Sequence, residues 1–317
     1  MKKNVEPPAH PHDTGYKYLL NRTRVFLQLL QSFVGQKWVE KIDAGSLTRL
    51  DKSFILPDFR NKELDLIYQG TLAGQEVIFY CLLELQSTVD HMMPYRLLEY
   101  MKGVWDDIIK DTKLAEVEKK GFLLPMIIPV VVFNGKANWT APLSFREKLK
   151  DVKEFEERGK KMLDFEYELI RVHAYGEDEL LNNNNLISTV FFLDQSADNE
   201  DIIARLKKTV PILLNLSRQD FMLLFNWVKK ILNRYMNPEE QREVEVIMEK
   251  DREKGVKYMI TNIERAIEKK IEEERKKYDE ERKKFIMGAL NEGLDLKTVA
   301  KITGLDEQQI RDIMEDD

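Results

Sequence analysis

Two carboxylates and one carboxamide stand at the ends of two neighbouring apolar segments. Asp65 begins the segment DLIY, and Glu84 and Gln86 end the apolar run 77–83. Residues 70–74, which include two glycines, suit the connection of a hairpin. Because a hairpin runs back along itself, it would place Asp65 at the same edge of a sheet as the other two residues. The spacing therefore predicts a D…ExQ cluster at adjacent strand ends.

Such a cluster has the donor chemistry of a metal-dependent nuclease. Carboxylates can hold one or two Mg²⁺ ions, which neutralise charge on a phosphate and activate water near neutral pH. Asp65 and Glu84 would be the ligands, with the backbone carbonyl of Leu85 as a further oxygen and Mn²⁺ as an alternative metal. Gln86 would orient the attacking water or a phosphate oxygen, because an amide carries no charge. The same short motif also fits two strand ends whose acids only face solvent.

The apolar patterns around these residues predict an α/β fold. Side chains alternate between the faces of a strand, and both faces are apolar over residues 77–83, which is typical of a sheet covered by helices. Residues 126–135 predict another buried strand, with Pro129 at its start or on a sheet edge. Residues 165–175 alternate and predict a further strand. Residues 202–235 predict two packed helices, and the asparagine run before them predicts a loop or helix boundary.

A helix expected over residues 92–110 would carry the cations that contact DNA. Arg96 and Lys102 are the nucleic-acid-binding candidates, and Lys110 lies further along the same helix. The alternative for Arg96 is a surface salt bridge with Glu99 or a neighbour. Tyr95 would pack against the site or hold the helix on the sheet. A local basic surface is required because the net charge of the whole chain is −6.

Four segments together carry a family resemblance: HDTGYKYLL, ELDLIYQG, LLELQSTVDHMMPYRLLEYM and LLPMIIPVVVFNGKANWTAPLSF, which begin at residues 12, 63, 82 and 123. In this order and spacing, the chain resembles the Rpn family. Its members are recombination-promoting nucleases, also catalogued as YhgA-like transposases, of the PD-(D/E)XK superfamily. The resemblance extends from the N-terminus to about residue 235 of the 317.

The resemblance implies a PD-(D/E)XK mixed sheet flanked by helices, and Mg²⁺-dependent cleavage of DNA. It matches Asp65 with the metal-binding aspartate, Glu84 with the second carboxylate, and Gln86 with the residue that replaces the superfamily lysine. This replacement is typical of the branch and leaves open how the water is activated. For Asp13, a helix N-cap is the alternative to a role in the site. The accessory candidates are Glu63, Asp13, His12 and Tyr95.

Composition indicates a cytoplasmic protein. The single cysteine, Cys81, cannot form an internal disulfide, and its place on an apolar strand face predicts packing rather than nucleophilic chemistry. The first residues lack the apolar core of a signal peptide. The longest apolar run, 122–133, contains two prolines and is too short to span a bilayer. Four histidines that are scattered along the chain form no pattern of zinc ligands.

The chain changes character after residue 237, which predicts a nuclease domain over 1–237, a long charged helix over 238–290 and a small tail over 291–317. Pro238 suits the first position of a helix. A narrow apolar seam follows, which predicts a coiled coil that forms a homo-oligomer or a helix that docks on the nuclease domain. The seam consists of Val256, Ile260, Ile263, Ile267, Ile271, Tyr278 and Phe285.

The tail has the outline of a helix-turn-helix without the charge of a DNA reader. Gly304 fits the turn, and Asp306 with Gln309 predicts a capping box for the second helix. That helix is rich in acids, so phosphate would repel it, and we interpret the tail as a packing or oligomerisation module. The apolar face of the first helix would comprise Leu296, Val299, Ala300 and Ile302.

Two functions of different class follow from the sequence. The first is a DNA endonuclease with little sequence preference, acting in recombination, on mobile elements or in defence against foreign DNA. The second is a catalytically silent DNA-associated or assembly protein that uses the helical tail for partners. Asp65 and Glu84 with Gln86 favour the first function. The negative net charge of the chain and the long tail favour the second.

Overall fold

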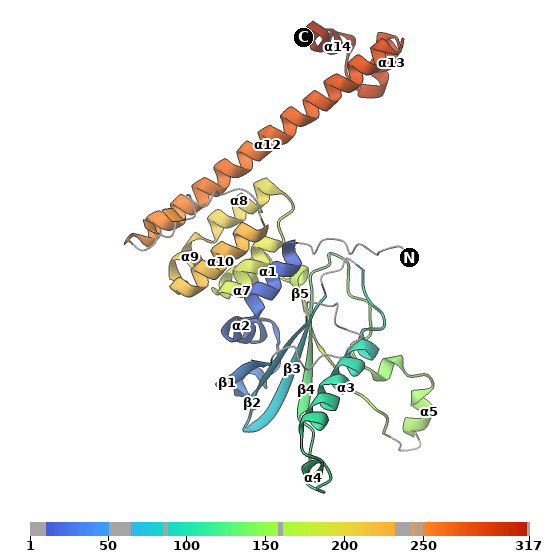
Figure 1. The fold of residues 1–317 in the computed structure, drawn as a ribbon, viewed down its shortest axis with the longest axis vertical. Helices are drawn as coiled ribbons and strands as arrows, with labels where there is room; N and C mark the ends of the chain where they lie inside the picture. The colour runs from blue at the N-terminus through green and yellow to red at the C-terminus, as the bar shows by residue number, and fades with distance from the viewer. Residues whose placement is uncertain are drawn as a thin grey trace. The chain divides into compact units, whose positions relative to one another are not determined.

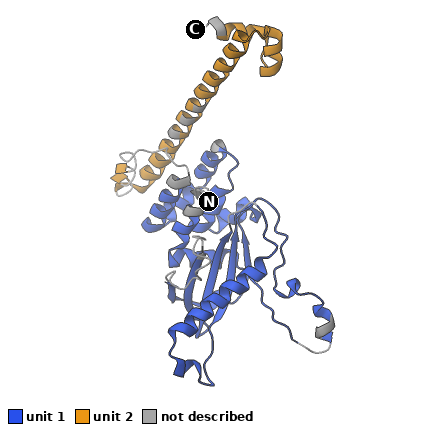
Figure 2. Cartoon of the chain, turned by 45° about the vertical axis from the view of Figure 1, so that its right-hand side comes forward, with its two compact units in different colours: residues 1–233 blue, residues 234–317 orange. Residues whose placement is uncertain are grey.

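The computed structural model describes residues 11–50, 65–84, 88–157, 161–231, 242–243, 246–247 and 250–315. Two compact units, residues 1–233 and 234–317, are coloured separately in Figure 2. Glu63, Leu85, Gln86 and Pro238 lie outside the described residues, as does the predicted boundary after residue 237. For His12, Asp13 and Asp65, the backbone alone is described.

The first unit contains a mixed sheet of five strands in the order β1-β2-β3-β4-β5 (Figure 1). Neighbouring strands β1, β2 and β3 run antiparallel, whereas β3, β4 and β5 run parallel. Helices flank the sheet, so the predicted α/β class with a mixed sheet is confirmed. The strand bounds are Ile42–Leu50, Asp65–Leu72, Gln75–Glu84, Met126–Phe133 and Glu168–Arg171.

The predicted hairpin is confirmed, but its turn is shorter than expected. Leu72 pairs with Gln75, so the connection consists of Ala73 and Gly74, which both have positive φ, as in a type I′ turn. Gly70 lies inside strand β2, where an added Cβ would lie 3.0 Å from Cδ1 of Leu47 on β1. Gly70 therefore permits the close approach of β1 and does not form the turn.

Apolar side chains cover both faces of β3, as the alternation predicts. On one face, Ile78, Tyr80 and Leu82 belong to a cluster with Leu97 and other residues of helix α3 (Met93–Asp111). This helix lies where residues 92–110 predict one. On the other face, Phe79 packs against Phe26 of α2 (Thr23–Phe33), whose ring also stacks on Tyr68 at 4.2 Å. Cys81 is buried, as expected for a packing residue.

Pro129 lies in the middle of β4 and not at its start. Among the described pairings, β5 joins β4 only from Val130 onward, so Pro129 has no paired strand on the β5 side and the predicted edge position is confirmed. The strand predicted within 165–175 is present, but β5 has only four residues because the chain then forms the 3₁₀ helix Val172–Ala174.

A helical layer completes the first unit. The hydroxyl of Tyr16 in α1 donates to Asp194 at the end of α7 at 2.9 Å, which joins segments far apart in sequence. Asn185 caps α7 by accepting from the backbone of Ser188, so the predicted helix boundary at the asparagine run is confirmed. Residues 199–231 form three helices, where two were predicted. The helices of this layer are α1 (Pro11–Leu20), α6 (Glu177–Asn182), α7 (Leu186–Asp194), α8 (Asn199–Lys208), α9 (Val210–Asn215) and α10 (Arg218–Ile231).

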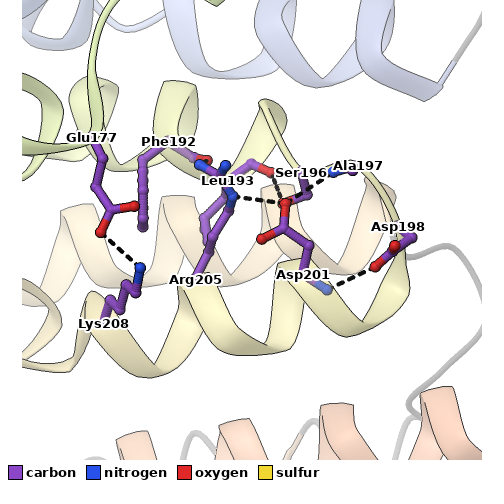
Figure 3. A network of polar contacts seen from close by, with 9 residues as sticks. All are labelled: Glu177, Phe192, Leu193, Ser196, Ala197, Asp198, Asp201, Arg205 and Lys208. Atoms are coloured by element: carbon purple, nitrogen blue, oxygen red, sulfur yellow. Dashed lines mark hydrogen bonds and ion pairs between the residues drawn. The ribbon is translucent and has the colours of Figure 1, made fainter.

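A polar network fixes helix α8 against its neighbours (Figure 3). Asp201 accepts from the backbone of Ala197 at 3.0 Å and from Nε of Arg205 at 3.0 Å. The backbone bond first, and then the bond from Arg205, hold the pKa of Asp201 below its ordinary value although partial burial raises it. Arg205 donates to the carbonyl of Phe192 at 3.0 Å, so the same side chain ties α8 to α7.

The second unit is helical in its described part. Helix α12 (Arg252–Asn291) is 40 residues long and is followed by α13 (Leu296–Thr303) and α14 (Glu307–Glu315). The first four seam residues, from Val256 to Ile267, are buried, whereas Ile271, Tyr278 and Phe285 are exposed. In the described part of α12, the seam is therefore buried as far as Ile267 and exposed beyond it.

The end of α12 forms a small core with the two short helices. Ile286, Val299 and Ile310 are buried together in this core. Gly304 has a φ of 69°, and Asp306 and Gln309 exchange the two hydrogen bonds of the predicted capping box. Ile302 is exposed, so its expected place on the apolar face is wrong. Within the described residues, every helix is too short or too polar to cross a bilayer.

Short elements complete the described chain. They are the helices α4 (Leu114–Val117) and α5 (Val152–Glu157) and the 3₁₀ helices η1 (Val39–Lys41) and η4 (Arg146–Lys148).

Candidate functional site

The hairpin register brings the backbone positions of Asp65 and Glu84 to the same edge of the sheet. Asp65 is the first residue of β2 and pairs with Leu82, two residues before the end of β3. Glu84 is the last residue of β3 and pairs with Phe133, the last residue of β4. The carboxyl ends of parallel strands in open α/β sheets are where ligands bind. The structure thus places both predicted carboxylate positions at the edge where a site is expected.

Glu84 is a buried carboxylate with a defined cationic partner. The residue is 5% exposed, and its Oε2 atom accepts a hydrogen bond from Nη1 of Arg96 at 3.1 Å. A buried charge requires such compensation, because the loss of its hydration is costly. The side chain comes from the end of β3, and the partner comes from the first turns of α3, so the packing of the helix on the sheet sets their distance.

Arg96 bonds to a second carboxylate with the same nitrogen. Its Nη1 lies 2.6 Å from Oδ2 of Asp90, and Oδ1 of Asp90 accepts from the backbone of Met92 at 2.8 Å. The alternative of a salt bridge with Glu99 or a neighbour is right about the pairing and wrong about Glu99 and the exposed position, because Arg96 is mostly buried and pairs with Glu84 and Asp90. Sequence reasoning missed Asp90, although an aspartate just before a helix start is a recognised signal.

Electrostatics keep Arg96 charged. Burial lowers the pKa of the Arg96 guanidinium, but hydrogen bonds with Asp90 and Tyr100 and the charge of Glu84 outweigh this effect. The pKa is therefore raised above its ordinary value. The guanidinium carbon also lies 6.0 Å from the ring centroid of Tyr100, one helical turn further along α3. The site thus contains a permanent cation beside a buried acid.

The other two α3 candidates face solvent. Tyr95 is exposed, and its hydroxyl bonds to Glu99, which raises the pKa of Tyr95. Its expected packing against the site is therefore wrong. Lys102 is exposed and forms an ion pair with Asp106 one turn later. Lys110 is exposed as well. Tyr95 and Lys102 are accessible to a large ligand, whereas Arg96 is engaged with the site acids.

Aromatic side chains lie beside this cluster on the face of the sheet that α3 covers. Phe133, which pairs with Glu84, contacts Trp139 with their ring centroids 4.9 Å apart. Trp139 donates to the hydroxyl of Tyr167 at 3.0 Å, and that hydroxyl donates to the carbonyl of Pro142 at 2.8 Å. Burial above all raises the pKa of Tyr167, and the negative charge of Asp90 adds to this effect. These contacts hold the loop after β4 beside the charged cluster of Glu84, Asp90 and Arg96.

Oxygen donors at this edge have the chemistry of a hard divalent cation site. The backbone of Asn134 donates to the carbonyl of Glu84 at 3.1 Å, while its own Oδ1 is buried and has no hydrogen-bond partner in the described structure. Glu84 is the one predicted ligand whose side chain is described. No group of three or more His, Cys, Asp or Glu side chains with metal-binding geometry occurs among the described residues. The donors present are nevertheless oxygens, which suit Mg²⁺.

Two curated relatives carry nuclease names. Recombination-promoting nuclease RpnC of Escherichia coli (strain K12) is 21% identical over 207 residues, which cover 65% of this chain and 65% of that protein. Inactive recombination-promoting nuclease-like protein RpnE of the same strain is 18% identical over 223 residues, which cover 69% and 70%. This chain thus spans about two thirds of the length of each. No solved structure matches it with significance.

A family match extends over most of the first compact unit. Residues 10–223 match the family described as "Putative transposase, YhgA-like". The matched range contains the hairpin, Glu84, Asp90 and Arg96, and it amounts to more than half of the chain. It also supports the resemblance to the Rpn nucleases that the sequence motifs carry. The chain belongs to the YhgA-like transposase family, which includes the Rpn recombination-promoting nucleases.

Proposed function

We propose that the protein is a Mg²⁺-dependent DNA endonuclease of the PD-(D/E)XK type with little sequence preference. One observation carries the proposal: the register of β2 and β3 places Asp65 and the buried Glu84 at one sheet edge. The name of RpnC, a relative over 65% of this chain, adds support. The reaction would serve recombination, mobile elements or defence against foreign DNA.

The proposed roles follow from the donors at this edge. Asp65, Glu84 and the carbonyl of Leu85 would hold Mg²⁺ or Mn²⁺, and Asn134 offers a further oxygen. The bound cation would supply charge neutralisation at the phosphate and a more acidic water. Gln86 would orient that water, whose oxygen attacks phosphorus while the bond to the leaving oxygen breaks. Glu63, His12 and Asp13 remain accessory candidates.

DNA would approach the exposed side of α3. Tyr95 and Lys102 are accessible there, and Lys102 could exchange Asp106 for a backbone phosphate. Such contacts fix position on a duplex without reading its sequence, in accord with the proposed low sequence preference. We further propose cytoplasmic action and a homo-oligomer formed through the C-terminal helices.

Cleavage of supercoiled plasmid tests the proposal. Purified protein is compared with Asp65→Ala and Glu84→Ala, each with Mg²⁺ or with EDTA, after circular dichroism shows that the variants are folded. Cleavage that requires the metal and disappears in both variants supports the nuclease and its two ligands. Metal-independent cleavage, or full activity of a folded Glu84→Ala variant, would contradict it.

A catalytically silent DNA-associated or assembly protein is the second candidate. Two observations favour it: one relative of similar coverage has the word "inactive" in its name, and Glu84 is paired with Arg96. Gel-shift binding to duplex DNA without cleavage by any form of the protein, under conditions that load the metal, would select this candidate.

A further inference from the structure

A single nitrogen of Arg96 is shared by two carboxylates that belong to different parts of the fold. Nη1 lies 2.6 Å from Asp90 and 3.1 Å from Glu84. The exposed fractions of the side chains rise outward through the cluster, from 7% for Glu84 and 17% for Arg96 to 32% for Asp90. The shorter bond is thus the outer one, and the longer bond leads to the proposed metal ligand.

Asp90 and Arg96 form a unit that does not depend on Glu84. Asp90 is held at the start of α3 by the hydrogen bond from the backbone of Met92. Arg96 belongs to the first turn of this helix and lies near the ring of Tyr100. Glu84 alone comes from the sheet. The guanidinium is therefore anchored on the helix, and Glu84 is the partner that can be exchanged.

A divalent cation at Glu84 would compete with this pairing. Before a cation binds, the buried carboxylate depends on Arg96, the one cation within ion-pair distance of Glu84 among the described residues. A bound cation supplies that compensation itself and repels the guanidinium at such short range. Arg96 occupies Oε2 of Glu84, so a cation that binds this oxygen displaces the guanidinium. Pairing with Arg96 and binding of a cation at Oε2 are thus alternative states of Glu84.

We propose, on the basis of the proposed nuclease function, that Arg96 is a positioning residue that exchanges partners when the metal site is filled. It holds the Glu84 carboxylate in place while the site is without a cation. It then remains on Asp90, and the donors released from Glu84 become available to a phosphate of the DNA. The guanidinium suits this exchange because it presents five N–H donors in a planar fork and always stays charged.

Two substitutions are expected to shift cation affinity in opposite directions. Arg96→Gln removes the competing charge, so Mg²⁺ should bind about 10-fold more tightly. Asp90→Asn keeps the oxygen that accepts from the backbone of Met92 but removes the charge that draws Arg96 away from Glu84. Arg96 should then pair more fully with Glu84, and Mg²⁺ affinity should fall by about 3- to 10-fold. Arg96→Lys, which keeps the charge, should lie closer to the wild type than Arg96→Gln.

The test measures thermal unfolding of the full chain during titration with Mg²⁺, which needs no catalytic activity. Without metal, Arg96→Gln should unfold about 5–10 °C lower than the wild type, because Glu84 is left buried and unpaired. Added Mg²⁺ should raise its midpoint more than that of the wild type. Lys102→Gln is the matched control, because it removes a cation from the same helix that pairs only with Asp106 in the described contacts, and its Mg²⁺ response should equal that of the wild type.

The outcomes separate this inference from the proposed function. If Mg²⁺ and Mn²⁺ stabilise neither the wild type nor Arg96→Gln, the metal site itself is refuted. If the wild type responds, and Glu84→Ala does not, but Arg96→Gln and Asp90→Asn shift affinity equally or in the same direction, the exchange is refuted while the metal site stands. If Arg96→Gln does not fold, the direction of the shift in Asp90→Asn decides alone.

Discussion

The charged cluster at the start of α3 and the middle of α12 are both rich in ion pairs, but these pairs have different origins. In α12, Glu272 with Lys276 and Lys277 with Glu281 are exposed pairs between residues four positions apart. Such pairs follow from helical spacing alone and contribute little individually. The pair of Arg96 with Glu84 joins a helix to a strand and is mostly buried.

The two kinds of ion pair differ in what happens when one partner is removed. An exposed pair can be broken and rehydrated, because water replaces the lost partner at little cost. A buried acid has no such replacement, so each substitution in the α3 cluster leaves an uncompensated charge or removes a proposed ligand. Substitutions in the two regions should therefore have effects that differ greatly, although the residue types are the same.

The largest difference should appear when one glutamate of each region is made neutral. Glu84→Gln should lower Mg²⁺-dependent plasmid cleavage at least about 100-fold, because the proposed ligand loses its charge. The fold should be kept, since Arg96 still pairs with Asp90. Glu272→Gln is the matched control and should leave the cleavage rate unchanged. Equal activities of the two variants would remove Glu84 from the proposed site.

Two adjacent residues of α12 should differ next most strongly. Ile286 is fully buried in the core with α13 and α14, whereas Phe285 is 53% exposed. Ile286→Ala should destabilise this core by about 2–4 kcal/mol because it creates a cavity, and Phe285→Ala should have little effect. Hydrogen exchange of residues 286–313 measures the loss, and cleavage by both variants should equal that of the wild type. Equal protection in the two variants would contradict the described core.

The elements whose signals are local could be predicted from the sequence. The hairpin, the bounds of α3 and the capping box of α14 follow from alternation, turn residues and cap spacing. The length of the β2–β3 turn could not be predicted from the sequence. Gly70 lies inside β2, where it allows β1 to pack closely, and only the pairing of the strands shows this. The exposure of Ile302 likewise depends on how three helices pack, since its spacing alone fits the apolar face.

The candidate site shows the same division between local and long-range information. Asp65 and Glu84 could be paired because a hairpin is a local structure. The partners of Arg96 could not, since helical spacing favours Glu99, whereas the structure selects Asp90 before the helix and Glu84 on the strand. Glu99 instead bonds to Tyr95. The packing of α3 on the sheet, which no local pattern encodes, decided between these acids.

The exposed line Ile271, Tyr278 and Phe285 allows a test of the proposed self-association. These residues recur every seven positions along the exposed part of α12. If copies of the chain associate there, Tyr278→Glu should convert an oligomer to a monomer in analytical ultracentrifugation. The stability of the monomer should change by less than about 0.5 kcal/mol, because Tyr278 is 63% exposed. Glu280→Gln, a substitution of a neighbouring exposed residue, is the control.

The outcome also sharpens the contrast between the two regions. A monomeric wild type would refute self-association and leave the middle of α12 as a solvated helix held by its own ion pairs. An unchanged oligomer in Tyr278→Glu would place the interface elsewhere in the chain.

The smallest effect should be the response of the α13 cap to acid. The backbone hydrogen bond from Thr298 first, and the bond from its hydroxyl second, hold the pKa of Asp295 below its ordinary value. A group whose pKa is lowered by folding stabilises the folded state fully above its unfolded pKa of about 3.9. That contribution is lost as pH falls below this value and through the lowered folded pKa.

Helicity at 222 nm, followed from pH 6 to pH 2, measures this loss as a slight decrease that begins below about pH 4. Asp295→Asn keeps a capping oxygen but has no proton to gain, so its titration should lack this component. Arg96 gives the contrasting case, because its pKa is raised above an ordinary value that already lies far above this range. It therefore stays charged throughout, and any acid sensitivity of its cluster must come from the carboxylates. Identical acid titrations of the wild type and Asp295→Asn would show that the charge of Asp295 contributes nothing to helix stability. A difference confined to low pH would assign the loss of helicity to the exposed Asp295 cap.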